Sequence, residues 1–328
     1  MKLYDDQLIV VTGGAGFIGS NVIKELNSKG IANIVVVDSL KESEKWKNLV
    51  GKQFYDILEK EQLFQWLEGR ESQIEAFIHL GACSSTVERN ASYLLENNYR
   101  YSVRLAEYAL KNKQRFIYAS SAATYGDGAL GFSDDHELLP QLHPLNMYGY
   151  SKHLFDLWAL NQGVLDQMTG LKYFNVYGPN EAHKGRMASA IVHLLPKVLA
   201  GESVQLFESS EPDKYINGGQ MRDFIYGKDV AKMTCAFLEN DATGIYNIGT
   251  GQPETWKSLA EALFAAADKP VKIEYIKMPA DLVGKYQNYT CADVAKTKKA
   301  LKQEFKTTPL PEAVRDYVQN YLLKGVLW

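Results

Sequence analysis

A glycine-rich segment directly after the first apolar run constrains the fold of this chain most. Residues 8–11 (Leu-Ile-Val-Val) have the length of a buried strand, and residues 12–19 (Thr-Gly-Gly-Ala-Gly-Phe-Ile-Gly) follow at once. Gly14, Gly16 and Gly19 match the spacing G-x-G-x-x-G. Glycines at this spacing allow a tight turn and let backbone N–H groups approach a pyrophosphate at a helix N-terminus. The segment therefore predicts a strand, a turn and a helix that bind a dinucleotide.

Strand-like apolar runs alternate with amphipathic stretches through the first half of the chain. This alternation predicts right-handed crossovers and a parallel sheet. We expect strands over residues 8–11, 34–37, 77–80, 116–119, 171–175 and 245–248, and helices over residues 20–28 and 93–111. The expected fold class is α/β, with a Rossmann-type doubly wound parallel sheet and a smaller, discontinuous α/β substrate-binding domain.

The composition changes after the strand expected over residues 171–175. Three prolines, a Gly-Gly pair and many polar side chains fall within residues 176–221, which indicates a lobe that faces a substrate. The chain then returns to the sheet. We therefore expect an NAD(P)-binding Rossmann domain of residues 1–175 plus 223–249, and a substrate-binding domain of residues 176–222 plus 250–328.

Charge and cysteine content exclude several classes of protein. The 328 residues carry a formal net charge of −3 and no basic run, so we expect no nucleic-acid partner. No apolar stretch is long enough for a signal-peptide core or a membrane span. Cys83, Cys235 and Cys291 are odd in number and far apart, which predicts neither a disulfide framework nor a metal site. We expect a cytoplasmic protein without a membrane partner or a metal.

The end of the second expected strand bears on the type of dinucleotide. Asp38 stands 19 residues beyond Gly19 and suits a carboxylate that binds a ribose 2′-hydroxyl, which favours NAD, although it also suits a cap or turn residue. Lys41 and Lys45 follow closely, and either can meet a 2′-phosphate, so the residues leave NADP open.

A third group of residues indicates redox chemistry on an alcohol. Tyr148 and Lys152 are four residues apart and share one face of a helix, where the cation favours the phenolate. We expect Tyr148 to exchange a proton with an alcohol, and Lys152 to hold the nicotinamide ribose and lower the tyrosine pKa. Ser121 follows a strand end and can donate a hydrogen bond to the substrate oxygen.

These motifs together resemble the extended short-chain dehydrogenases/reductases that act on nucleotide sugars. Longer strings resemble the ADP-L-glycero-D-manno-heptose 6-epimerase family over nearly the whole chain. They are residues 79–86 (HLGACSST), 97–99 (NNY), 173–179 (YFNVYGP) and 183–189 (HKGRMAS). The resemblance implies inversion at C6 of the heptose in ADP-D-glycero-β-D-manno-heptose, a lipopolysaccharide core precursor, with tightly held NADP. It also implies a homo-oligomer, typically a pentamer.

Inversion at C6 leads us to expect two proton-transfer groups. The hydride leaves C6 to give a transient aldehyde, which rotates before the same reduced nicotinamide returns the hydride to the opposite face. Because proton transfer needs hydrogen-bond reach, one group does not easily serve both geometries, and two are expected. The resemblance supplies Tyr148 and Lys184. Lys184 needs a lowered pKa to act as a base; the alternative is a phosphate-binding or surface lysine.

The resemblance, together with the glycine spacing, assigns further residues to two groups. The cofactor-facing group comprises Gly13, Gly14, Gly16, Phe17, Ile18, Gly19, Asp38, Ser39, Lys45, Lys60, Leu80, Gly81, Ala82, Cys83, Ser84, Asn97, Tyr148, Lys152 and Val176. The substrate-facing group comprises Ser85, Asn175, Lys184, Arg186, His193, Phe207, Glu208, Ser209, Ser210, Arg222 and Tyr286. Arg222 suits the substrate diphosphate because a guanidinium can form two parallel hydrogen bonds to a phosphate. His193 equally suits a packing histidine on a helix.

The chain departs from the family pattern at three places. Arg186 replaces a serine, Leu80 replaces a glutamate, and residues 212–221 form an insertion before Arg222. These departures bear on the diphosphate contacts and on one cofactor contact.

Related activities are separated by particular residues. A 4,6-dehydratase needs an acid/base pair after the strand-end hydroxyl, where this chain has Ala122 and Ala123. A UDP-hexose 4-epimerase keeps Ser121 and the Tyr-x3-Lys pair but does not need Lys184, so it is the alternative enzyme. A non-catalytic NAD(P)-binding regulatory protein is a more distant alternative, which would be expected to lack the tyrosine or the lysine.

Overall fold

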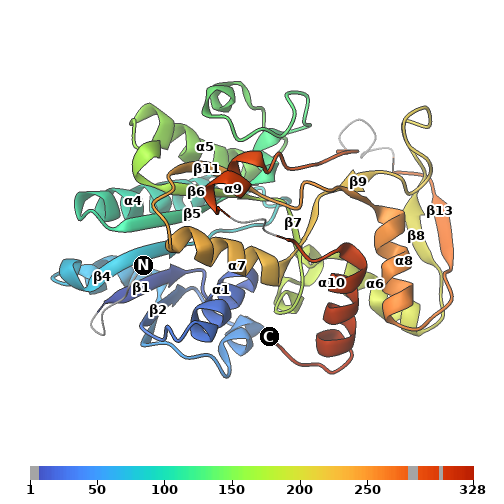
Figure 1. Cartoon of the computed structure of the whole chain (residues 1–328), viewed down its shortest axis with the longest axis horizontal. Helices are drawn as coiled ribbons and strands as arrows, with labels where there is room; N and C mark the ends of the chain where they lie inside the picture. Colours follow the sequence, from blue (N-terminus) through green and yellow to red (C-terminus); the bar gives the residue numbers. More distant parts are fainter. Residues whose placement is uncertain (1–6, 280–286, 303–305) are drawn as a thin grey trace.

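Seven parallel strands form the central sheet of the computed structural model, which describes residues 7–279, 287–302 and 306–328 (Figure 1). Their order across the sheet is β11-β6-β5-β4-β1-β2-β3. The strands are β1 (Leu8–Thr12), β2 (Ile34–Asp38), β3 (Asp56–Glu59), β4 (Ile74–His79), β5 (Arg115–Ser121), β6 (Thr169–Tyr173) and β11 (Gly244–Ile248). The strand order reverses between β1 and β4, and ligands bind outside the carboxyl ends of strands at such a point.

Helices cover both faces of this sheet. One face carries α1 (Phe17–Ser28) and α7 (Gly227–Leu238), and the other carries α2 (Leu63–Leu67), α4 (Tyr101–Lys111) and α5 (Met147–Asn161) (Figure 1). Alternate residues of β1 divide between the two cores: Leu8 and Val10 pack toward α4 and α5, while Ile9 and Val11 pack toward α1 and α7. A sheet that is covered on both faces needs apolar residues on both. The expected doubly wound parallel fold is confirmed.

Several boundaries differ from the sequence expectation. The strand expected over residues 77–80 occupies Ile74–His79, and the strand expected to end at residue 175 ends at Tyr173. Asn175 instead opens β7 (Asn175–Tyr177), which pairs with β10 (Phe224–Tyr226). The helix expected over residues 93–111 is a run of α3 (Ala91–Leu94), a π-helical turn (Leu95–Arg100) and α4. Edge strand β3 was not expected, because it is short and only half-buried.

The smaller lobe has a core of its own. Helices α6 (Ala190–Leu199), α8 (Trp256–Ala266) and α10 (Leu310–Tyr317) pack beside the parallel pair β8 (Val204–Phe207) and β13 (Ile273–Ile276). A second, antiparallel pair joins β9 (Met221–Arg222) to β12 (Glu254–Thr255). Helix α9 (Ala295–Ala300) lies against β11.

The division into domains at residues 175, 222 and 249 stays a prediction. Among the described helices, none is long and apolar enough to span a membrane.

Candidate active site

The glycine turn after β1 brings its backbone very close to neighbouring chain. Gly13 has a φ of 67°, and a Cβ there would lie 2.7 Å from the backbone nitrogen of Gly81. A Cβ on Gly19 would lie 2.1 Å from the Gly13 carbonyl oxygen. Only glycine fits such approaches. The turn leads into the N-terminus of α1, so the half-buried backbone at Gly16, which lines the cavity, suits the pyrophosphate of a dinucleotide.

A cavity of about 810 Å³ extends from this turn to the smaller lobe along the carboxyl ends of the strands. It brings together the four predicted catalytic residues, Ser121, Tyr148, Lys152 and Lys184. It is also lined by most of the other predicted residues: Gly13, Gly16, Phe17, Ile18, Gly19, Asp38, Ser39, Lys45, Leu80, Gly81, Ala82, Cys83, Ser84, Ser85, Asn175 and Val176. Gly14 is buried against Val36 instead of lining the cavity.

The Asp38 carboxylate at the end of β2 already has three donors. Its Oδ2 accepts a hydrogen bond from the Ala15 N–H at 2.9 Å. Its Oδ1 accepts from the Ser39 N–H at 2.7 Å and from Lys45 Nζ at 2.6 Å. The carboxylate thereby ties the glycine turn to the β2 end. It is less available to a ribose hydroxyl than the sequence alone suggests.

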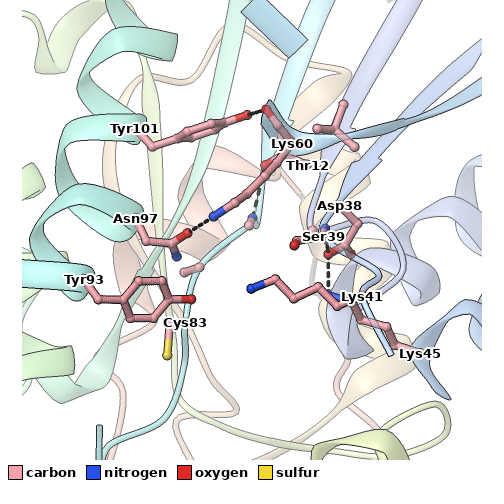
Figure 2. Close-up of a pocket in the computed structure, with 14 residues that line it drawn as sticks. Thr12, Asp38, Ser39, Lys41, Lys45, Lys60, Cys83, Tyr93, Asn97 and Tyr101 are labelled. Carbon is pink, nitrogen blue, oxygen red and sulfur yellow. Dashed lines mark hydrogen bonds and ion pairs between the residues drawn. The ribbon is translucent and has the colours of Figure 1, made fainter. Parts of the chain in front are cut away.

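A second pocket, of about 180 Å³, adjoins the cavity at this end (Figure 2). Three lysines line it, and Figure 2 shows the Lys41 side chain pointing into it. Lys60 Nζ donates to the Asn97 side-chain oxygen, so both of these predicted residues reach the pocket. With Lys45 bound to Asp38, the remaining charge of the pocket is positive, which suits a phosphate.

Ser121 and Tyr148 meet at the carboxyl end of β5. Asn146 caps α5, accepting a hydrogen bond from the Gly149 N–H at 2.8 Å, and this places Tyr148 in the first helical turn. Burial raises the pKa of Tyr148, and the neighbouring Ser121 side chain opposes the rise. A helix N-terminus favours an anion, so this turn suits a phenol that gives up its proton.

Lys152 lies one turn further along α5 and is only 3 % exposed. Burial lowers its pKa to about 8, although the Asp156 carboxylate acts in the opposite direction. No hydrogen bond or ion pair to its ammonium occurs within the described part of the chain. Desolvation dominates, so the pKa of Tyr148 is raised overall, and the expectation that Lys152 lowers it stays a prediction. Desolvation is a property of the folded environment, which spacing along a helix does not report.

Lys184 reaches the cavity from the connection between β7 and α6. It lies in a short 3₁₀-helical segment (Ala182–Met187), and its Nζ is 5.5 Å from the centre of the Phe17 ring. Burial lowers the pKa of Lys184, while the charge of Glu181 opposes this shift. The lowered pKa required of a base at this position is therefore present.

Other residues of the predicted substrate group lie away from the cavity. Arg186 and His193 are exposed to solvent. The Arg222 guanidinium lies 6.0 Å from the ring centre of Trp256, which does line the cavity. Phe207, Glu208, Ser209 and Ser210 lie beside the inserted segment, where Gly218 N–H donates to the Phe207 carbonyl at 3.0 Å. Tyr286 lies outside the described residues.

Sequence reasoning missed some residues that shape the site. Asn98, fully buried in the π-helical turn, accepts from the Cys83 N–H at 2.8 Å and donates to the Cys83 carbonyl at 2.9 Å. Asparagine is unfavourable inside a helix. Its presence there therefore indicates that its side-chain amide makes specific hydrogen bonds. His183 and Trp256 also line the cavity. Trp256 begins an amphipathic helix and gives no such signal.

Comparison with known proteins gives results that agree with this geometry. Residues 9–249 match the model of the NAD dependent epimerase/dehydratase family. The chain is 49 % identical over 318 residues to ADP-L-glycero-D-manno-heptose-6-epimerase of Nitratidesulfovibrio vulgaris, covering 96 % of this chain and 98 % of the relative. It is 45 % identical over 329 residues to the protein of that name from Fusobacterium nucleatum, covering 97 % and 98 %.

A solved structure gives the same result in three dimensions. The crystal structure of ADP-L-glycero-D-manno-heptose-6-epimerase from Helicobacter pylori superposes with a TM-score of 0.79 at 28 % identity, covering 98 % of this chain and 99 % of that one. The matches in sequence and in structure extend over both lobes and the cavity between strand ends and smaller lobe. This chain therefore belongs to the NAD dependent epimerase/dehydratase family and, within it, to the ADP-L-glycero-D-manno-heptose-6-epimerases.

Proposed function

We propose that this chain interconverts ADP-D-glycero-β-D-manno-heptose and ADP-L-glycero-β-D-manno-heptose by inverting C6. One observation carries the proposal: Lys184, with a lowered pKa, enters the same cavity as Ser121, Tyr148 and Lys152. Two proton-transfer groups are what an inversion with an intervening rotation requires. The names of the relatives from N. vulgaris, F. nucleatum and H. pylori support the substrate.

The side chains divide the chemistry between them. A nicotinamide held by the glycine turn and Lys152 would supply the hydride chemistry at C6, on one face of the carbon before the aldehyde rotates and on the opposite face afterwards. Tyr148 exchanges the C6 hydroxyl proton in one geometry, with Ser121 hydrogen-bonded to the same oxygen. Lys184 exchanges it in the other geometry: it takes the proton as a free amine, which burial favours, and delivers a proton as the ammonium when Tyr148 has acted as the base. Each turnover removes one hydride and one proton and restores both, so no redox equivalent is consumed.

We also propose that the nucleotide diphosphate binds near Arg222. Its guanidinium lies 6.0 Å from the ring centre of Trp256, which lines the cavity, and a guanidinium can bind two phosphate oxygens at once. Ser85 and Asn175 line the cavity and suit contacts with the sugar. The assignments of Arg186, His193, Tyr286 and the group Phe207, Glu208, Ser209 and Ser210 stay predictions.

NADP is the proposed cofactor, in preference to NAD. Asp38 is occupied by three donors, whereas Lys41, Lys45 and Lys60 surround the adjoining pocket. A 2′-phosphate in this pocket would gain charge-assisted hydrogen bonds, each worth about 1.5–3 kcal/mol.

Titration calorimetry with each dinucleotide tests the choice of NADP. In the Lys41→Ala variant, affinity for NADP is expected to fall about tenfold or more, and affinity for NAD to change less than about twofold. Lys47→Ala is the matched control, because Lys47 is an exposed neighbour outside the pocket. Equal losses for both dinucleotides would contradict a 2′-phosphate at Lys41.

Proton NMR of the purified enzyme with ADP-D-glycero-β-D-manno-heptose tests the reaction itself. Without added cofactor, we expect a mixture of the two C6 epimers, which also shows a resident nicotinamide. Tyr148→Phe serves as the inactive control. No conversion, even with NADP added, would contradict the proposal, and conversion of UDP-galactose instead would favour a UDP-hexose 4-epimerase.

We further propose a homo-oligomer, a pentamer by analogy with the family, located in the cytoplasm. Light scattering of the purified protein should give five chain masses. A single chain mass at micromolar concentration would contradict this assembly.

A further inference from the structure

Glu181 is a buried carboxylate at the base of the segment that carries Lys184. It is 1 % exposed. Its Oε1 accepts hydrogen bonds from the Gly178 N–H at 3.2 Å and from Ser189 Oγ at 2.6 Å. Its Oε2 accepts from the Ser189 N–H at 2.7 Å. Gly178 and Ser189 are the two ends of the connection between β7 and α6. One side chain therefore closes the loop of residues 178–189.

The Tyr317 hydroxyl on α10 faces the same carboxylate from the smaller lobe, and the charge of Glu181 adds to the rise that burial causes in the pKa of that hydroxyl. Two backbone N–H groups and the Ser189 hydroxyl thus donate to a group that only accepts. A glutamine in its place would turn an amide donor toward one of these partners, so the isosteric variant breaks the closure without opening a cavity.

The closed loop determines where Lys184 lies. The Lys184 N–H donates to the Glu181 carbonyl at 2.9 Å, and the Ala188 N–H donates to the Gly185 carbonyl at 3.0 Å. Gly185 has a φ of 53°, so the chain reverses directly after the lysine. The turn directs Lys184 toward Phe17 at the start of the cofactor helix. If the loop ends separated, the lysine would lose this fixed approach.

We infer that Glu181 is a positioning residue for Lys184, holding the loop ends together so that the amine reaches the substrate oxygen at C6. This inference rests on the proposed function. Displacement of a reacting group by about 1 Å can cost about 100-fold in rate, so the effect is expected in kcat. Substrate affinity depends on other residues and should change little.

Single-turnover reduction of the bound nicotinamide separates positioning from general damage. Each epimer is mixed in turn with the wild type, Glu181→Gln and Lys184→Met, and formation of the reduced cofactor is followed by absorbance. Glu181→Gln is expected to slow oxidation of the epimer that Lys184 serves about 10–100-fold. It should leave the epimer served by Tyr148 within about twofold, with KM unchanged. Equal slowing of both epimers, or of neither, would overturn the inference.

A measurement without substrate keeps the inference separate from the proposed function. Acylation of lysines by a water-soluble reagent, read by mass spectrometry, reports the accessibility of each amine. Glu181→Gln should raise labelling of Lys184 several-fold and leave Lys41 unchanged as an internal reference. Glu239→Gln, at an exposed ion pair with Lys29, is the control variant. Unchanged Lys184 labelling would overturn the inference, whereas altered labelling without any turnover in the wild type would overturn only the proposed function.

Discussion

The cofactor end and the substrate end of the cavity are built differently. Every residue predicted to face the cofactor, except buried Gly14, lines the cavity or its adjoining pocket. Among the described residues predicted to face the substrate, Ser85, Asn175 and Lys184 line the cavity, whereas Arg186 and His193 are exposed.

The difference follows from the kind of backbone at each end. The carboxyl ends of β2, β1, β4 and β5 lie side by side in one sheet, so motifs that follow these strands converge. The substrate end is formed by connections and by two short strand pairs, whose placement depends on packing in the smaller lobe. A motif therefore predicts position reliably at a strand end and poorly in a connection.

The largest expected effect is at the junction of the two ends, in the cavity that Tyr148 and Lys184 both line. Tyr148→Phe and Lys184→Met should each reduce epimerisation by about 10³-fold or more, because each removes one of two proton-transfer groups. Epimer formation by NMR and cofactor content by absorbance check the result. Both variants should retain cofactor. Near-normal turnover in either would mean that one group serves both geometries.

Arg222→Ala sharpens the comparison at the substrate end. Loss of a charge-assisted contact with a diphosphate should raise KM about tenfold or more and change kcat little. Initial rates over a range of substrate concentrations measure both. Arg222→Lys should be intermediate, because lysine keeps the charge but loses the planar fork. An unchanged KM in Arg222→Ala would place the diphosphate elsewhere.

The dependence of kcat on pH tests the two lysines together. Lys152 acts as a cation and has a pKa of about 8, so the rate should fall about tenfold per unit above that pH. Lys184 removes a proton as a free amine with a lowered pKa, so with the epimer that Lys184 deprotonates as substrate the rate should also fall as the pH drops below that pKa. Lys152→Arg stays protonated and should remove the upper decline. A wild-type profile without an upper decline would exclude this role for Lys152.

Arg186→Ala should have the smallest effect, less than about twofold in KM, because an exposed arginine is screened by solvent. Its charge differs from that of the family serine, so substrate kinetics at low and high salt are the suitable measurement. A tenfold rise in KM would show that the loop bearing Arg186 moves onto the substrate and would weaken the contrast between the two ends.

Much of the fold was predictable because it is encoded locally. Apolar runs of strand length located six of the seven sheet strands, and the glycine spacing located the turn and α1. Strand β3 was not predicted, because a short, half-buried edge strand has no continuous apolar run. The division into β6 and β7 was not predicted, because no glycine or proline interrupts the sequence from Leu171 to Tyr177. The second strand, β7, is separate because it pairs with the distant strand β10.

The sequence by itself determined the family, the dinucleotide turn and the Tyr148–Lys152 pair, since each depends on spacing within one element or one short motif. Tertiary structure decided the electrostatics of the site. Burial raises the pKa of Tyr148 and lowers those of Lys152 and Lys184, and packing brings Lys184 to Phe17 and Arg222 to Trp256. Desolvation and long-range contact arise only when distant segments exclude water together, so no local pattern reports them.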